Sequence, residues 1–336
     1  MSFRNLCHHF LPYLFSSLGF LGIYAGGVYS GVGILVIFIL HPLLDIILTK
    51  LFGEIESLLT PPSNASIYFY PFYQTILLFT GLYFISQQTE ISHQILGAVS
   101  LGIITGGFGI TVSHELIHRP KKWEIGLGVF LLSQVSYAVF RIEHVLGHHR
   151  NVATPDDPAS AKLNDNVYTF VPKAIIKTHL SALSIENKRI EKKSLSVLNH
   201  RLLHYLVFQA LWPIIFYALF GISGALLFIT QSIVAIILLE LVDYIEHYGL
   251  QRKLLPNGNY EPVGPQHSWD TNFFITNTSL FNLGKHAHHH QKAGVPYQKL
   301  TSTKQANQYQ FGYSTAIIIS LIPPLWFRVI NPKINA

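Results

Sequence analysis

The sequence predicts an all-α integral membrane protein, a single domain over residues 1–336 with six transmembrane helices and a histidine-rich cytoplasmic cap. The chain is 49% hydrophobic with a mean hydropathy of +0.34. Only 12% of its residues are charged, about half the usual share in soluble domains. Several apolar runs reach the roughly 20 residues that a helix needs to cross a bilayer. Eighteen histidines accompany a single cysteine.

Six apolar runs are long enough to be transmembrane helices. The second run contains His41, Pro42 and Asp45, which we place in its final cytoplasmic turns, where polar groups are tolerated. A seventh run, 125–140, has only 16 residues. We interpret it as a re-entrant or interfacial helix, because a crossing there would separate the histidines on its two sides. The expected spans are about 11–29, 31–50, 70–88, 94–113, 204–221 and 223–246.

The distribution of basic residues orients these spans. With the N-terminus in the cytoplasm, Arg4 precedes the first span and Lys50 ends the second. Of the 23 lysines and arginines, thirteen lie between the fourth and fifth spans and eight follow the sixth. Every basic residue then lies on the cytoplasmic side, as the positive-inside rule requires. We predict cytoplasmic termini and a cytoplasmic cap of residues 114–203 and 247–336.

The composition excludes several classes of protein. With Cys7 as the only cysteine, the chain has no disulfide framework, zinc ribbon or iron–sulfur cluster of its own. It contains no GxGxxG or GxxxxGK[ST] run and so no recognisable nucleotide-binding module. Topology accounts for the formal charge of +6, and we expect no nucleic-acid partner. A bound metal would have nitrogen ligands.

Four histidine clusters carry the chemistry, namely HELIHR (114–119), EHVLGHHR (143–150), DYIEHYGL (243–250) and HAHHH (286–290). In the first two clusters, histidines four residues apart share one face of a helix. We therefore expect His144 and His148 to face the same way and His149 to point elsewhere. The clusters contain nine candidate ligands: His114, His118, His144, His148, His149, His247, His286, His289 and His290.

The predicted topology brings these clusters to one membrane boundary. The fourth and sixth spans run in the same direction, so His114 and His247 both emerge on the cytoplasmic face, and the other two clusters follow them. A single cluster could be a polar helix end, and His247 alone could face a helix dipole. Nine imidazoles exceed the needs of one tetrahedral zinc ion. They favour two metal ions, with iron doing oxygen chemistry as the natural candidate and copper or zinc as alternatives.

Other residues near the clusters have possible roles. Glu115, Glu143, Asp243 and Glu246 are candidates to orient ligand N–H groups, or else are solvated charges at helix ends. Asp243 is the best placed of these, four residues before His247. Gly106 and Gly107 either leave room for a substrate chain or allow close helix packing. We expect the remaining histidines at surface or interfacial positions: His8, His9, His41, His93, His179, His200, His204, His267 and His288.

Taken together, the four motifs resemble the signature of the bacterial alkane 1-monooxygenases. These are integral-membrane non-haem di-iron hydroxylases related to xylene monooxygenase and, more distantly, to membrane fatty-acid desaturases. The resemblance covers about residues 100–300. The second cluster is H-x-x-x-H-H, where acyl desaturases usually have H-x-x-H-H. ATPDDPAS at 153–160 and HSW at 267–269 also look like the alkane hydroxylases. The resemblance implies that the nine candidate histidines bind two iron ions.

The sequence departs from the family pattern beside the ligands. The usual LQRHSDHH is LGKHAHHH here, with Gly284, Lys285, Ala287 and His288 at the changed positions. The usual NYxEHYGL begins with Asp243, and HELxHK ends in arginine. All nine ligand positions are retained. The departures leave the substrate open between a linear alkane, a xylene-type aromatic compound and a fatty-acyl chain.

The resemblance implies O2-dependent hydroxylation of a terminal C–H bond of a medium-chain alkane to a primary alcohol, in the inner membrane of a bacterium. No catalytic residue is expected beyond the metal ligands. The reaction needs two electrons. The sequence has no motif for a flavin, a nicotinamide nucleotide or an iron–sulfur cluster, so another protein has to supply them. A rubredoxin or ferredoxin with its NAD(P)H reductase would supply them, and an acidic donor would suit the basic face. The hydrophobic substrate would enter from the lipid.

Other classes of protein make different demands on the sequence. A fatty-acyl hydroxylase or desaturase would use the same iron chemistry. A metal transporter should carry its ligands near the bilayer midplane on broken helices, whereas these histidines lie at helix ends. A bis-histidine haem protein would need histidines that face each other inside the helix bundle.

Overall fold

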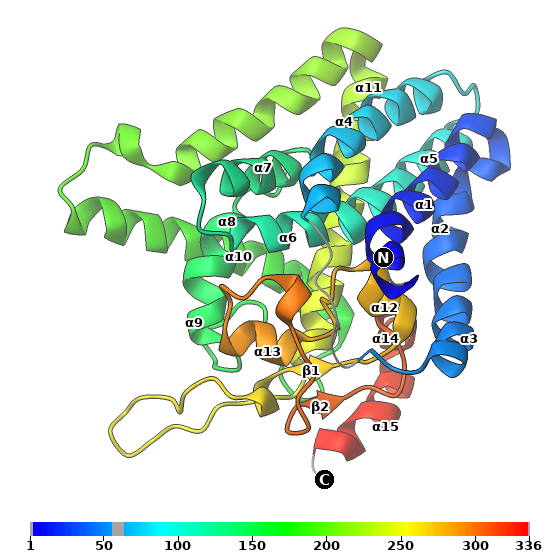
Figure 1. The fold of residues 1–336 in the computed structure, drawn as a ribbon. Helices are drawn as coiled ribbons and strands as arrows, with labels where there is room; N and C mark the ends of the chain where they lie inside the picture. The colour runs from blue at the N-terminus through cyan, green and yellow to red at the C-terminus, as the bar shows by residue number, and fades with distance from the viewer. Residues whose placement is uncertain (1–2, 56–63, 335–336) are drawn as a thin grey trace.

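The structure, a computed structural model, describes residues 3–55 and 64–334, and nearly all of its regular structure is helical (Figure 1). The last two residues of the expected cap lie outside the described residues. The α-helices are α1 (Phe3–Ala25), α2 (Val32–Leu35), α3 (His41–Phe52), α4 (Ala65–Ser86), α5 (Ile91–Ile104), α6 (Thr111–Ile117), α7 (Lys122–Ser133), α8 (Phe140–Glu143), α9 (His149–Asn151), α10 (Val167–Lys192), α11 (Arg201–His247), α12 (Phe274–Ser279), α13 (His286–Gln291), α14 (Tyr313–Ser320) and α15 (Pro323–Ile334).

Short irregular elements join and interrupt these helices. Three are π-helical turns, η2 (Val36–Leu40), η3 (Thr105–Ile110) and η4 (His144–His148). The two short strands β1 (Trp269–Asp270) and β2 (Asn307–Gln308) pair in parallel and connect distant parts of the C-terminal region. The 3₁₀ turns are η1 (Gly27–Gly31), η5 (Val197–Asn199), η6 (Pro265–His267) and η7 (Tyr297–Lys299).

Within the described residues, four helical stretches are long and apolar enough to cross a membrane. They are Leu6–Ala25, Gly27–Phe52, Ile91–Ile117 and Arg201–His247. The expected span 70–88 corresponds to α4, a helix of 22 residues that is not among the four. The structure therefore supports a helical membrane protein, and the count of six spans stays a prediction.

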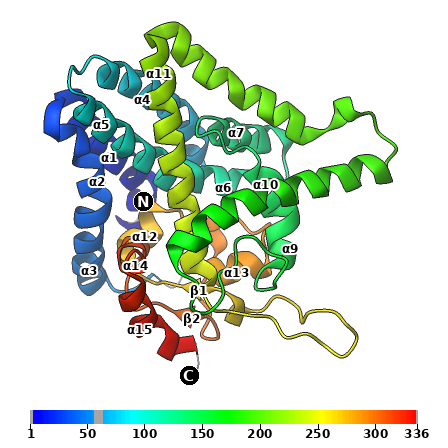
Figure 2. The same cartoon turned by 180° about the vertical axis from the view of Figure 1, so that it is seen from behind.

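The two spans expected at 204–221 and 223–246 lie in one long helix, α11. Its backbone is non-helical at Phe220 and Gly221, and Gly221 has a φ of +67°, a conformation that glycine adopts without steric strain. At this kink the chain changes direction. The first part of α11 and the preceding α10 form an arm that projects from the body, while the second part passes through its centre (Figure 2).

The apolar run at 125–140 forms a helix that is too short to cross a bilayer. Its helix, α7, has 12 residues, which is about 18 Å of helix against a hydrocarbon thickness of about 30 Å. It packs on α6, where the Ser113 hydroxyl donates a hydrogen bond to the Gly128 carbonyl at 2.8 Å. The helix thus lies beside the first histidine cluster.

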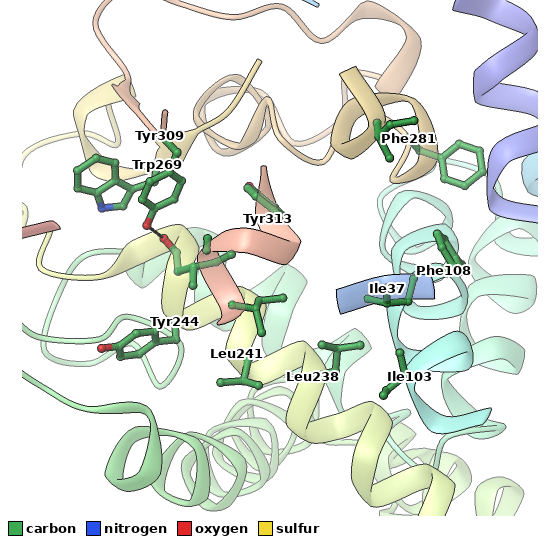
Figure 3. Close-up of a cluster of buried hydrophobic side chains, with 14 of the residues drawn as sticks. Ile37, Ile103, Phe108, Leu238, Leu241, Tyr244, Trp269, Phe281, Tyr309 and Tyr313 are labelled. Carbon is green, nitrogen blue, oxygen red and sulfur yellow. Dashed lines mark hydrogen bonds between the residues drawn. The ribbon is translucent and has the colours of Figure 1, made fainter. Parts of the chain in front are cut away.

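Close packing of α5 and η3 against α11 forms the centre of the molecule. A Cβ on Gly102 would lie 2.5 Å from the Gln231 carbonyl oxygen, and one on Gly106 would lie 2.8 Å from the Ala235 Cα. Only glycine permits this approach of the backbones. Apolar side chains from different helices belong to one buried cluster, as Figure 3 shows for Ile37, Phe108 and Leu238.

Two polar residues of the second predicted span, which we placed in its final cytoplasmic turns, are buried and hydrogen-bonded within the protein. Asp45 and His41 are each 1% exposed. Asp45 accepts hydrogen bonds from the backbone and the hydroxyl of Thr276, at 3.0 and 2.5 Å. The ring nitrogens of His41 lie 2.9 Å from the Ser279 hydroxyl and 3.1 Å from that of Ser314. These bonds fasten α3 to α12 and α14.

We predict that two adjacent glycines respond differently to the same substitution. Gly106→Ala should lower the free energy of unfolding by about 1–3 kcal/mol, because the new methyl group overpacks the contact with α11. A Cβ on Gly107 would meet nothing closer than Leu238 Cδ2 at 3.8 Å, so Gly107→Ala should leave stability unchanged or slightly higher. Thermal unfolding in detergent measures both, and equal melting temperatures would contradict the packing argument.

Candidate metal centre

The four histidine clusters come together from four separate parts of the fold. His114 lies in α6 and His118 caps its end, while the second cluster lies in η4 and α9. His247 ends α11, and the fourth cluster forms α13. The nine candidate ligands form two groups, in each of which the ligand atoms all lie within 4.8 Å of one another. The five-histidine group is His114, His118, His144, His149 and His289, and the four-histidine group is His148, His247, His286 and His290.

The second cluster does not pair as an α-helix would pair it. We expected His144 and His148 to share a face, but His144 joins His149 in the five-histidine group and His148 joins the other. The reason is the π-helical turn η4 (His144–His148), in which the backbone repeat runs from i to i+5. His144 and His149 are five residues apart, and their Nε2 atoms lie 3.1 Å from each other. Adjacent residues can thus serve different groups.

The Nε2 atoms of the rings converge within each group. In the four-histidine group, His286 Nε2 lies 3.0 Å from that of His247 and 2.9 Å from that of His290. In the five-histidine group, His149 Nε2 lies 3.1 Å from that of His289. An imidazole nitrogen carries at most one proton, so protons alone do not satisfy nitrogens that each face two others. A cation bound between the lone pairs of these nitrogens satisfies all of them.

Burial keeps these rings in the form that binds metal. Desolvation holds the pKa of His144, His289 and His290 well below the ordinary value, and neighbouring histidines lower it further. Metal ions bind the neutral imidazole. The Nε2 atoms of His114 and His118 are buried and have no hydrogen-bond partner in the described residues. A bound metal ion would satisfy such atoms, and the donor set therefore fits two nitrogen-ligated metal ions.

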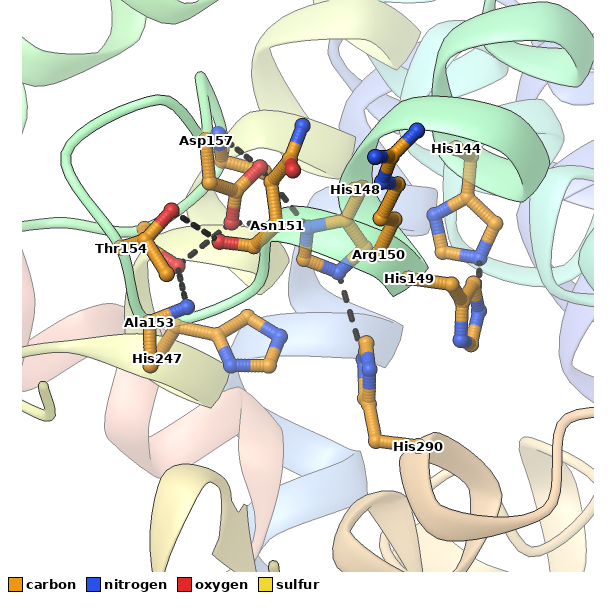
Figure 4. Close-up of polar contacts among 12 residues, drawn as sticks. His144, His148, His149, Arg150, Asn151, Ala153, Thr154, Asp157, His247 and His290 are labelled. Carbon is orange, nitrogen blue, oxygen red and sulfur yellow. Dashed lines mark hydrogen bonds and ion pairs between the residues drawn. The ribbon is translucent and has the colours of Figure 1, made fainter. Parts of the chain in front are cut away.

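Two rings of the four-histidine group have a hydrogen-bond partner on the opposite nitrogen, and a third has a carboxylate nearby without a hydrogen bond. His148 Nδ1 lies 3.0 and 3.1 Å from the Asp157 carboxylate oxygens (Figure 4). His247 Nδ1 lies 3.2 Å from the His267 carbonyl oxygen, and His286 Nδ1 lies 3.2 Å from Glu246 Oε1. A partner on Nδ1 fixes the proton there and turns the Nε2 lone pair toward the metal.

Asp157 is a functional candidate that the sequence interpretation missed. It follows the second cluster in the stretch ATPDDPAS, which contributes to the family resemblance but contains no histidine that would mark a ligand. Burial tends to raise the pKa of Asp157, but the His148 ring and the Ser160 hydroxyl favour its charged form, and the net pKa is below the ordinary value. Asp157 is therefore an anion beside the ring of His148, a member of the four-histidine group. Only the fold, which turns this loop back toward η4, shows the contact.

The four carboxylates expected to orient ligands have different environments. Glu246 lies near His286, as described above. Glu115 forms an ion pair with Arg119 at 2.5 Å and accepts a hydrogen bond from the Tyr297 backbone. Glu143 accepts a hydrogen bond from the Ser181 hydroxyl at 3.2 Å. Asp243 lines the apolar cavity described below.

The residues that depart from the family pattern shape the start of α13. Gly284 packs so closely that a Cβ would lie 2.8 Å from the Thr271 carbonyl oxygen. Lys285 is buried and hydrogen-bonds Asn272. Ala287 is buried, and its backbone donates a hydrogen bond of 2.7 Å to Asp270. These local contacts fix the position of α13, the short helix that carries His286, His289 and His290.

The remaining histidines divide between surface and interior. His288 points away from both groups, and its Nδ1 accepts a hydrogen bond from the Thr301 backbone at 3.0 Å. Four others are buried, which corrects the expectation of surface or interfacial positions: His8, His41, His200 and His267. His267 Nδ1 accepts a bond from the Gly264 backbone and Nε2 lies 3.2 Å from Glu261, so its carbonyl is held in place beneath His247.

An apolar cavity of about 60 Å³ is lined by members of both histidine groups. Its walls include Ile37, Phe108 and Leu238, and Gly107 leaves part of the wall open. The cavity lining also includes polar residues, among them members of the two histidine groups and two carboxylates. These residues are His114, His144, Asp243, Glu246 and His286.

Comparison with known proteins identifies clear relatives. The sequence profile of the fatty acid desaturase family matches residues 92–320. Alkane 1-monooxygenase 2 of Alcanivorax borkumensis is 41% identical over 78% of this chain and 69% of its own length. Alkane 1-monooxygenase 2 of Pseudomonas aeruginosa is 43% identical, over 71% of this chain and 64% of its own. The xylene/toluene monooxygenase hydroxylase component of Pseudomonas putida is 27% identical over 98% and 89%.

We predict that Asp157→Asn weakens metal binding by about 10- to 100-fold, the usual effect of losing such a partner of a ligand. The amide presents a weaker, uncharged partner to the His148 ring. The matched control is Asp156→Asn, since Asp156 is the exposed neighbour. Metal affinity measured by competition with a chelator tests the pair. Equal affinities in both variants would show that Asp157 does not support the ligand.

Proposed function

The chain belongs to the fatty acid desaturase family and, within it, to the alkane 1-monooxygenases, and we propose that it hydroxylates the terminal carbon of a medium-chain alkane. The observation that carries this proposal is the apolar cavity that ends at both histidine groups. An alkane offers no polar group for recognition, so an enzyme that acts on one needs a dry apolar channel that presents one end of the chain to the oxidant.

We assign the nine histidines of the two groups as ligands of two iron ions. All-nitrogen sites of neutral imidazoles suit iron, among other metals. When bound, the iron pair would activate O2 so that one oxygen atom enters the substrate and the other leaves as water. Asp157 and the His267 carbonyl hold the Nδ1 side of two ligand rings, which leaves the Nε2 atoms of these rings for the metal.

The side chains of the cavity would position the substrate and keep out water. Ile37, Phe108 and Leu238 surround the alkyl chain with apolar surface. Because Gly107 has no side chain, the alkyl chain of the substrate can pass between η3 and α11 at this residue. The terminal methyl group would then lie beside His114 and His144 of the five-histidine group and His286 of the four-histidine group. This arrangement favours attack at the end of a linear chain.

The reaction converts an alkane, O2, two electrons and two protons into an alcohol and water. The electrons would come from a rubredoxin or ferredoxin that an NAD(P)H reductase recharges. The chain would lie in the cytoplasmic membrane of a bacterium with six spans and with both termini inside. Two supports for this topology are the kink at Gly221, which divides α11 into two segments, and the distribution of basic residues.

Turnover of octane under ¹⁸O2 tests the proposal. The iron-loaded chain, supplied with rubredoxin, its reductase and NADH, should produce 1-octanol that carries one ¹⁸O atom. Removal of iron by a chelator should abolish the product, and Fe(II) but not Zn(II) should restore it, because zinc has no redox chemistry.

The alternatives give different products. An alkene or unsaturated acyl chain without ¹⁸O would identify a desaturase. A clear preference for xylene over octane would identify an aromatic hydroxylase, and a labelled hydroxy fatty acid would identify an acyl hydroxylase. Stoichiometric zinc without turnover of any of these substrates would contradict the proposed oxygen chemistry altogether.

A further inference from the structure

A second cavity lies on the other side of the four-histidine group. Its volume is about 440 Å³, within the size range of binding sites. It is bordered by the loop 153–165, by the start of α10 and by the hairpin 250–260, which projects from the body as a long yellow loop in Figure 1. The proposed reaction gives this cavity no role, because the substrate occupies the apolar cavity.

Basic side chains surround the second cavity. Lys162, Lys173, Lys177 and Lys253 line it and are exposed. The ion pairs found among residues 3–55 and 64–334 involve none of these lysines. The two carboxylates of the lining are Asp165 and the buried Asp157, which faces His148. The rim thus presents a strongly positive field to a partner.

The floor of this cavity connects directly with the candidate metal centre. Asp157 lines the cavity, and its carboxylate contacts His148 Nδ1 at 3.0 Å. The opposite nitrogen of the same ring, Nε2, lies 3.2 Å from His290 Nε2 inside the four-histidine group. Asp157 is therefore the one side chain between the cavity and the candidate ligand His148, and Figure 4 shows Asp157, His148 and His290 in this order.

The hairpin adds apolar surface to the basic rim. Leu254 is 64% exposed and lines the cavity, and the adjacent Leu255 is also exposed. Leu254 pairs with Tyr260 across the hairpin, and the Arg252 guanidinium lies 6.0 Å from the Tyr260 ring. An apolar contact beside a ring of charges is typical of a protein interface, whereas a small anion would need no exposed leucines.

We propose that this basic cavity and its hairpin are the docking surface for the acidic electron-donor protein, and that electrons enter the centre through Asp157 and His148. The inference rests on the proposed function, which requires such a donor. Each docking event oxidises the donor by one electron, and two events serve each O2. Charge complementarity speeds such an encounter, and the short connection through His148 gives the electron its route.

Binding of an acidic rubredoxin tests the proposal without depending on turnover. The full-length protein is placed in phosphatidylcholine nanodiscs, and its affinity for fluorescently labelled rubredoxin is measured at several salt concentrations. Lys173→Glu/Lys177→Glu should weaken binding at least tenfold and flatten its salt dependence. Lys173→Gln/Lys177→Gln should have an intermediate effect, because it removes the attraction without adding repulsion.

The same helix supplies a matched control. Lys188 and Lys192 are also exposed and four residues apart in α10, but they lie outside the cavity lining. Lys188→Glu/Lys192→Glu should change the affinity less than twofold. An equal loss in this control, or wild-type affinity in the Lys173/Lys177 variant, would overturn the proposed docking surface.

Octane hydroxylation driven by hydrogen peroxide separates this inference from the proposed function. Peroxide supplies oxygen and electrons together, so the Lys173→Glu/Lys177→Glu variant should keep wild-type peroxide-driven activity while losing rubredoxin-driven activity. If the wild type hydroxylates octane and the variant keeps both activities, only the docking surface is refuted. If the wild type oxidises octane from neither source, the proposed function itself has failed.

Discussion

Coordination by neutral imidazoles is the interaction on which the rest of this structure depends. Nine Nε2 or Nδ1 atoms have to meet in two small volumes, and no single helix presents that many histidines in one direction. The ligands therefore come from η4 with the adjoining α9, from α13 and from the ends of α6 and α11, which lie in separate parts of the sequence. The π-turn of η4 allows the neighbouring His148 and His149 to serve different groups.

The same constraint explains why so many polar groups are buried in an apolar protein. Uncharged rings at a membrane boundary need partners that hold their protons, and Asp157 and the His267 carbonyl fill this role for two rings. Asp45 and His41 fasten α3 to the part of the chain that carries α13. The apolar cavity ends at the histidines from one side, and the basic cavity reaches them from the other. Substrate and electrons thus have separate approaches.

The sequence predicted the positions of the histidine clusters better than the way their members combine. Spacing and basic-residue topology indicated that His114 and His247 lie on one face, and the structure brings them into neighbouring groups. The grouping of His144 with His149 was not predictable from helical periodicity, because a π-turn leaves no reliable signal in a single sequence. Asp157 was not assigned because its contact with His148, nine residues earlier, depends on the conformation of an irregular loop, which sequence periodicity does not predict. The exact number of spans depends on how a membrane surrounds α4 and α11, which apolar length alone does not decide.

Mössbauer spectroscopy of the protein loaded with ⁵⁷Fe tests the central claim most directly. Two iron ions held by five and by four histidines differ in ligand number, so they should give two quadrupole doublets of equal area at two irons per chain. A chain that binds one iron ion with a single doublet, or that takes up iron only at weak, heterogeneous sites, would contradict the assignment of the two histidine groups as a di-iron centre.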